Sequence, residues 1–318
     1  TSDIVSVGKR WPSSLTILSA MTMAAPVRSS MTPMMVPRTI TKPMYPRMPP
    51  KPDLMPLTGG YRLTPVMQIG ADVYCDTQCI IRELERRHPE PTLFPGGAEG
   101  MAWGVGRWTD GPMFDNILEV VFADAADDMP DEFKADRGLL YFGPGFDLSA
   151  LQEIMTDSLV QLRAQFSWMD ERVAGRDFML GAEPGLPDAL CYYLVWFLRG
   201  RYSKGPEFLD QFQHLMNWEQ RVEAIGHGRP TDMNSADALA IAKDATPAGQ
   251  RSDVVDDLAG LHTGDNVAVE PTGVSGCTAV AGTVIHIDNQ EIALARTDEV
   301  IGNVVVHFPR AGYRGTKV

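Results

Sequence analysis

A long amphipathic segment in the middle of the chain limits the possible folds most strongly. Between residues 148 and 173, apolar side chains recur at steps of three or four, which places them on one face of an α-helix. They are Leu148, Leu151, Met155, Leu159, Leu162, Phe166, Met169 and Val173. Two further apolar segments, 188–199 and 208–225, predict helices that pack against it. We therefore expect residues 98–230 to form an all-helical domain.

The apolar spacing changes to a period of two near the C-terminus. Short apolar stretches alternate there with Gly-Asp, Asp-Asn and Gly-Asn pairs, which favour turns. The predicted strands are Val267 to Val269, Val280 to Ile287, Ile292 to Leu294 and Val304 to Phe308. This pattern predicts a small antiparallel, barrel-like β domain over residues 259–318. A polar linker over residues 231–258, with room for a short helix, joins it to the helical domain.

The composition excludes several classes of protein. With 318 residues, of which 44% are apolar and 22% are charged, the chain can bury a core without disulfides. Its net charge of −13 argues against a nucleic-acid partner, and no uncharged apolar stretch reaches the ~18 residues that span a membrane. The four cysteines and six histidines lack the spacing of zinc ligands. We expect free thiols, no metal and a cytoplasmic location.

The first 47 residues differ from the rest of the chain. The first 50 positions hold six basic residues against one acidic residue, together with eight of the 24 prolines. Prolines at this density exclude a long helix or a central strand, so we predict an atypical or disordered start. A short strand near Ile4 to Val7 and a helix at Leu15 to Ala25 stay open. So does a targeting peptide, because Lys9 and Arg10 precede an apolar run.

The segment from residue 64 to residue 77 carries the most specific motif. The Thr64–Pro65 pair precedes a predicted hairpin with strands at 66–69 and 73–75, and the Asp76–Thr77 pair then begins a helix. This order resembles the second half of the thioredoxin-like domain of the glutathione S-transferase family. Residues 48–95 are identified with that glutathione-binding part by the resemblance.

The resemblance implies a role for these four residues. In the family the proline is cis and exposes the backbone of the residue before it, so Thr64 and Pro65 would pair with the cysteinyl part of glutathione like an added β-strand. Asp76 would meet the ammonium group of the zwitterionic γ-glutamyl end, and Thr77 with the helix N-terminal amides would meet its carboxylate. Taken singly, a turn proline and a helix cap explain the same residues.

The helical region extends the resemblance. Residues 181–188 read Gly-Ala-Glu-Pro-Gly-Leu-Pro-Asp and resemble the family's Ser/Thr-x-x-Asp capping box, with Gly185 in place of the hydroxyl residue. Asp188 is therefore predicted to be structural. Several aromatic side chains belong either to the helical core or to the apolar pocket in which the family holds its electrophile. They are Trp103, Trp108, Phe114, Tyr192, Tyr193 and Trp196.

The catalytic position of the family is not recognisable in this sequence. These enzymes carry a Tyr, Ser or Cys between the first strand and the first helix, where it stabilises the glutathione thiolate. If the N-terminal strand and helix are a remnant of that unit, Ser13 or Ser14 falls at the helix start and is the candidate. Two ordinary serines are the alternative. The expected fold is an α/β thioredoxin-like domain without a recognisable first third, an all-α bundle and a barrel-like β domain.

The resemblance implies a cytoplasmic, homodimeric transferase that conjugates glutathione, its co-substrate, to a small hydrophobic electrophile, without nucleic-acid, membrane or metal partners. Two alternatives stay open. The chain is a non-catalytic binding or scaffold protein of the same fold, or it is a damaged enzyme in which residues 8–47 are read in an altered frame. Near the C-terminus, His307 with Arg310 and Arg314 could bind an anion, although a paired strand histidine and solvated arginines explain them as well.

Overall fold

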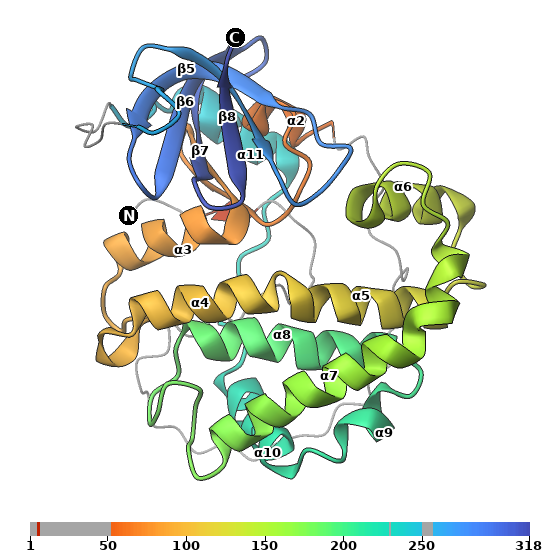
Figure 1. Cartoon of the computed structure of the whole chain (residues 1–318). Coiled ribbons are helices and arrows are strands. Elements are labelled where there is room, and N and C mark those ends of the chain that lie inside the picture. Colours follow the sequence, from red (N-terminus) through yellow and green to blue (C-terminus); the bar gives the residue numbers. More distant parts are fainter. Residues whose placement is uncertain (1–4, 7–51, 229, 250–256) are drawn as a thin grey trace.

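The computed structural model describes residues 5–6, 52–228, 230–249 and 257–318. A twisted β-sheet with helices on both of its faces lies at one end of the molecule, and a helical bundle lies at the other (Figure 1). Helix α3 (Asp76–Arg87) lies between the sheet and the bundle (Figure 1). It therefore connects the two parts in space as well as in sequence.

The predicted hairpin is confirmed, with a tighter turn than expected. β2 (Val66–Ile69) pairs antiparallel with β3 (Asp72–Cys75), and only Gly70 and Ala71 connect them. Asp72 was predicted as part of the turn but lies in β3. Gly70 adopts a φ of 61°, which glycine reaches without the steric cost of a Cβ atom. The predicted helix follows at once, since α3 begins at Asp76.

The C-terminal strands join this hairpin in one sheet. The strand order is β1-β2-β3-β7-β6-β5-β4-β8, and β7 pairs parallel with β3 so that Val306 lies opposite Val73. The bounds are β1 (Val5–Ser6), β4 (Asn266–Pro271), β5 (Val280–Ile287), β6 (Glu291–Asp298), β7 (Gly302–Pro309) and β8 (Tyr313–Lys317). The antiparallel pairing predicted for the C-terminal strands is confirmed from β4 to β7. β3 is therefore paired on both sides rather than exposed at an edge.

Successive side chains of β3 point into two different cores, as the alternation of a strand requires. Tyr74 belongs to the core that contains α3 and the helical bundle. Val73 and Cys75 belong to a second core that also contains residues of β4 to β7. α2 (Met55–Thr58) and α11 (Ser235–Asp244) pack against this second side of the sheet. The C-terminal strands and the hairpin thus share both backbone pairing and a core.

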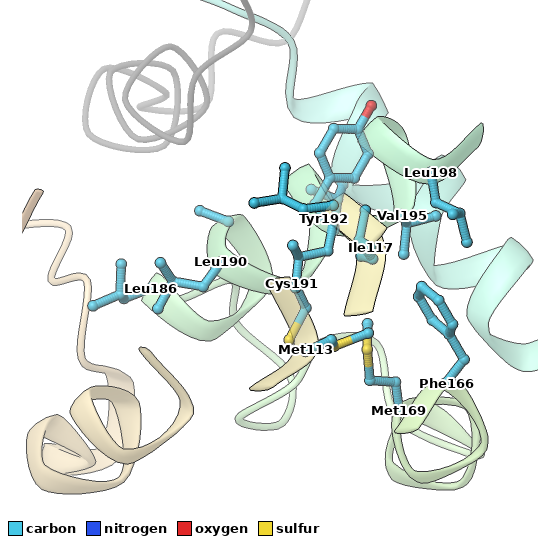
Figure 2. Packing of buried hydrophobic residues seen from close by; sticks show 14 of the residues in the cluster. Met113, Ile117, Phe166, Met169, Leu186, Leu190, Cys191, Tyr192, Val195 and Leu198 are labelled. Atoms are coloured by element: carbon cyan, nitrogen blue, oxygen red, sulfur yellow. The ribbon is translucent and has the colours of Figure 1, made fainter. Parts of the chain in front are cut away.

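The predicted helical domain is observed between residues 99 and 225. Its helices are α4 (Glu99–Thr109), α5 (Pro112–Asp124), α6 (Asp131–Phe142), α7 (Leu151–Val173), α8 (Leu186–Arg201), α9 (Gly205–Leu209) and α10 (Gln213–Ile225). The apolar stripe that predicts α7 is buried at Leu162, Phe166 and Met169. Figure 2 shows Phe166 and Met169 beside Met113 and Ile117 of α5 and the apolar face of α8.

Asp188 has the structural role that the sequence predicts. Its Oδ2 accepts a hydrogen bond from the Gly185 N–H at 2.9 Å, and its Oδ1 accepts from the Met179 N–H at 2.8 Å and from the Trp218 indole at 2.7 Å. The absence of a hydroxyl residue at position 185 has a steric reason. A Cβ atom on Gly185 would lie 2.9 Å from Cδ of Pro95, so the close packing of the chain favours glycine there.

The cysteines in the structure are free thiols, as predicted. Cys75, Cys79 and Cys191 are buried, whereas Cys277 is half-buried. Burial raises the pKa of each of the three buried thiols, so they remain protonated near neutral pH. Among the helices that the structure describes, none combines the length and the apolar character needed to cross a membrane.

Candidate functional site

The hairpin brings the two predicted residue pairs to one end of the sheet. Val66 pairs with Cys75, so Pro65 precedes one strand of that pair and Asp76 follows the other. The Thr64–Pro65 peptide bond is cis, as the resemblance implied. Thr64 is exposed and Pro65 is half-buried, so the residue before the cis bond is open to solvent close to the start of α3.

Asp76 occupies an unusual backbone conformation. Its φ is 73°, and it is the one non-glycine residue with positive φ in the described part of the chain. Aspartate tolerates this left-handed region better than most residues because its short side chain can bond nearby backbone groups. Here Oδ1 of Asp76 accepts a hydrogen bond from the Gln78 N–H at 2.9 Å. The carboxylate is thereby fixed over the first turn of α3, next to Thr77.

Two tyrosines far apart in the sequence complete the surroundings of Asp76. The Tyr313 hydroxyl donates to Oδ2 of Asp76 at 3.0 Å. The Tyr61 hydroxyl lies 2.8 Å from the Tyr313 oxygen. Because Tyr313 uses its proton on Asp76, Tyr61 must donate to Tyr313. Burial raises the pKa of both phenols, so they stay protonated and act as donors.

The helical domain adds a second carboxylate. Asp110 follows α4 and accepts a hydrogen bond from the Tyr193 hydroxyl of α8 at 3.2 Å. The surrounding protein and the negative charge of Asp76 raise the pKa of Asp110 to about 6, although its side chain retains solvent access. Arg107, in the last turn of α4, counteracts this effect on both carboxylates because its positive charge lowers their pKa values. We call Tyr61, Asp76, Arg107, Asp110, Tyr193 and Tyr313 the Asp76 cluster.

The pKa of Asp76 is the balance of opposing contributions. Burial raises the pKa, whereas the hydrogen bonds from Gln78 and Tyr313 and the charge of Arg107 lower it. The net shift is upward. A half-buried carboxylate that needs donors to stay ionised is suited to bind a cation, because an ammonium group would stabilise the charged form further.

The sequence identified only part of this arrangement. Thr64, Pro65, Asp76 and Thr77 were predicted as one site, and the structure places them at one end of the hairpin. Ser13 and Ser14 lie outside the described residues. Tyr313 and Asp110 were missed because nothing in their local sequence connects them to the hairpin. Tyr193 was selected only as one of several aromatic candidates for an apolar pocket.

The other aromatic candidates have mainly structural surroundings. Tyr192 is 5% exposed and belongs to the helical core. The Trp108 indole donates to Gln165 of α7 at 2.7 Å, and the Trp103 indole donates to Glu99 at 3.0 Å. The Phe114 ring lies 6.3 Å from the Tyr193 ring and thus near the Asp76 cluster. Of the aromatic set, Tyr193 has the clearest polar connection to that cluster.

His307 is a paired strand histidine. Its Nδ1 lies 2.7 Å from Oε1 of Glu291, and its Nε2 lies 3.0 Å from Oδ1 of Asp72. Two carboxylates at the ring nitrogens leave no position there for an anion, so the structural explanation holds. Arg310 pairs with Asp257 and Arg314 pairs with Glu270. The contacts of His307 with Asp72 and Glu291 also link β3 to β6 and β7.

Comparison with known proteins shows the family to which the chain belongs. The family model described as "Glutathione S-transferase, C-terminal domain" matches residues 152–221. A GST-like protein from Pseudomonas syringae, known from its crystal structure, is 34% identical. The alignment covers 86% of this chain and 88% of that chain, with a TM-score of 0.66. The chain belongs to the glutathione S-transferase family.

Other solved structures show more distant similarity. A glutathione S-transferase of Ceriporiopsis subvermispora, solved in complex with glutathione, is 17% identical, covering 52% of this chain and 71% of that chain, with a TM-score of 0.42. The β-etherase LigF from Sphingobium sp. strain SYK-6 is 16% identical, covering 51% of this chain and 74% of that chain, with a TM-score of 0.41. No curated protein sequence matches the chain.

Proposed function

We propose that the protein binds glutathione at the end of the hairpin and conjugates its thiolate to a small hydrophobic electrophile. The observation that carries this proposal is the position of Asp76. Its carboxylate is held in a left-handed turn at the start of α3, and Val66–Cys75 pairing puts it beside the Thr64–Pro65 bond. A backbone segment for an extended peptide and a carboxylate for an ammonium group therefore lie together.

Each part of glutathione has a matching group at this site. Thr64 is exposed, and its backbone, followed by Pro65, can pair with the cysteinyl residue in the manner of an added strand. The Asp76 carboxylate attracts the γ-glutamyl ammonium group. The Thr77 hydroxyl and the first amides of α3 can donate to the γ-glutamyl carboxylate, where the helix dipole also favours negative charge.

The remaining parts of the reaction belong to the same proposal. Ser13 or Ser14 would hydrogen-bond the glutathione sulfur and favour its thiolate, the nucleophile. The electrophile would lie on the helical side, near Phe114 and Tyr193. The protein would act as a homodimer in the cytoplasm. The alternative is a scaffold protein that binds glutathione, or another ligand, without turnover.

The test combines binding and turnover. Reduced glutathione is titrated calorimetrically into the full chain and into Asp76→Ala, and conjugation of a model electrophile is then followed by absorbance. We expect binding in the range of about 1 μM to 1 mM that Asp76→Ala weakens at least about tenfold. Unchanged affinity in Asp76→Ala contradicts the site. Binding by the full chain without any conjugation supports the scaffold protein instead.

A further inference from the structure

The C-terminal strand β8 reaches the candidate glutathione site through Tyr313. We infer that Tyr313 is a positioning residue of that site, which holds the Asp76 carboxylate ionised and correctly aimed for the γ-glutamyl ammonium group. The C-terminal strands, which share one sheet with the hairpin, then contribute to the binding site. This inference rests on the proposed function.

The topology explains how Tyr313 reaches a residue so far away in the sequence. β3 and β7 run parallel, with Tyr74 opposite His307, so the C-terminal ends of both strands lie at the same end of the sheet. Asp76 follows the end of β3 directly. Tyr313 begins β8 after a short turn that follows β7. Parallel pairing of β3 with β7 therefore places the beginnings of α3 and β8 side by side.

Contacts along the turn fix this approach. The Gln78 side chain of α3 donates to the Ala311 carbonyl at 3.1 Å. The Tyr313 N–H donates to the Arg310 carbonyl at 3.3 Å, which closes the turn. Gly312 adopts a φ of 87°, and a Cβ atom there would lie 3.5 Å from the Arg107 guanidinium. The turn is thus hydrogen-bonded to α3 and lies close to Arg107 of α4.

The Tyr313 ring packs against two other aromatic rings. Its centroid lies 5.8 Å from that of Phe308 in β7 and 6.3 Å from that of Tyr61. Tyr61 is 2% exposed, so the hydroxyl that donates to Tyr313 has a fixed position. The result is a directed series of hydrogen bonds from Tyr61 to Tyr313 and from Tyr313 to Asp76. Such a series orients the proton of Tyr313 toward the carboxylate.

The hydrogen bond has a consequence for charge. Burial raises the pKa of Asp76, and the Tyr313 hydroxyl opposes that shift because it stabilises the ionised carboxylate. The other groups that act on this balance are Gln78, Arg107 and Asp110. Cys75 and Tyr61 are buried, with raised pKa values, and stay neutral near neutral pH. Without the Tyr313 hydroxyl, a larger fraction of Asp76 would be protonated at mildly acidic pH.

The test is glutathione affinity as a function of pH for Tyr313→Phe, which keeps the ring and removes only the hydroxyl. We expect Tyr313→Phe to weaken binding by about tenfold at mildly acidic pH and by less at mildly alkaline pH, where Asp76 is ionised in either protein. Tyr61→Phe should shift the affinity in the same direction by a smaller factor. Tyr202→Phe in the helical domain serves as the matched control and should leave the affinity unchanged.

The outcomes separate this inference from the proposed function. If the unmodified chain does not bind glutathione, the proposed function fails and the inference fails with it. If the unmodified chain binds and folded Tyr313→Phe binds equally well at every pH, only the inference is wrong. Tighter binding by Tyr313→Phe also overturns it, because the hydroxyl would then compete with the ammonium group for Asp76. Thermal unfolding of each variant verifies that it is folded.

Discussion

Nε2 of His307 lies 3.0 Å from Oδ1 of Asp72, so a buried polar pair joins β7 to β3 in addition to their backbone pairing. Glu291 of β6 binds the other ring nitrogen, and the Tyr74 ring stacks on the imidazole with centroids 4.2 Å apart. The Ala248 N–H donates to the second oxygen of Asp72 at 2.8 Å. The connection between the hairpin and the C-terminal strands is therefore polar at its centre.

The His307 network predicts a pH dependence of stability. Burial alone would lower the pKa of His307, but hydrogen bonds with Asp72 and Glu291 outweigh it, and the pKa is raised. Because the pKa of His307 is raised in the folded protein, its protonation contributes stability. This contribution is fully present below the unfolded-state pKa of about 6.5 and is lost as the pH rises through the folded-state pKa. Thermal unfolding measured from mildly acidic to alkaline pH should show this decline.

His307→Gln tests the origin of that dependence. Removing one member of a buried charged network leaves the other members without compensation, so we expect a loss of about 3 kcal/mol or more in the free energy of unfolding. The pH-dependent decline should become shallower in the variant. Arg314→Gln, which alters an exposed pair with Glu270, is the control and should cost little. A variant that keeps the full decline would show that another group titrates.

The conformation of Asp76 suggests a substitution that separates charge from backbone. Asp76→Asn keeps a residue that tolerates positive φ, so the fold should be retained. Because the amide carries no charge, we expect glutathione affinity to fall by about tenfold or more. Calorimetry measures the affinity, and Asp157→Asn on the exposed side of α7 is the matched control. Equal losses in both variants would argue against a specific ammonium site.

Asp188 should matter for stability and not for binding. Its carboxylate accepts hydrogen bonds from Met179, Gly185 and Trp218, all within the helical domain. Asp188→Ala leaves these donors without their acceptor, and we expect a loss of about 3 kcal/mol or more in denaturant unfolding. Glutathione affinity of the folded fraction should be unchanged. A large loss of affinity without loss of stability would refute the structural assignment.

Substituting serine for Gly185 tests the steric explanation for glycine at this position, because serine is a usual residue of the family's capping box there. A serine there would supply the missing hydroxyl of the capping box, which ordinarily stabilises a helix. In this chain its Cβ atom would lie 2.9 Å from Pro95 and 3.1 Å from Leu180. We therefore expect Gly185→Ser to destabilise the protein, by about 1–3 kcal/mol. A rise in the melting temperature would show that the helix cap outweighs the crowding.

Sequence periodicity predicted most elements because their burial is regular. The stripe of α7 and the alternation of β4 at Val267 and Val269 identify buried faces that any tertiary arrangement must cover. β8 was missed because Tyr313 to Lys317 contains no alternation of apolar residues. The strand forms because β4 offers it a pairing edge, which is a property of the tertiary structure.

Part of the candidate site could likewise be predicted from the sequence, and part of it could not. The hairpin and the start of α3 could be predicted because Thr64, Pro65 and Asp76 lie within one short segment. The contribution of Tyr313 could not, because it depends on parallel pairing between β3 and β7, which no local pattern encodes. Asp110 depends likewise on how α4 packs beneath α3. Long-range pairing therefore supplies the part of the site that sequence analysis lacked.

The most direct test is an amide NMR titration of the full chain with reduced glutathione. Binding at the end of the hairpin should shift the amides of Thr64, Asp76, Thr77 and Gln78 saturably, with a single dissociation constant. The amide of Tyr313 should shift with them, because its side chain contacts Asp76. Absence of shifts, or saturable shifts confined to other elements, would contradict a glutathione site at this position.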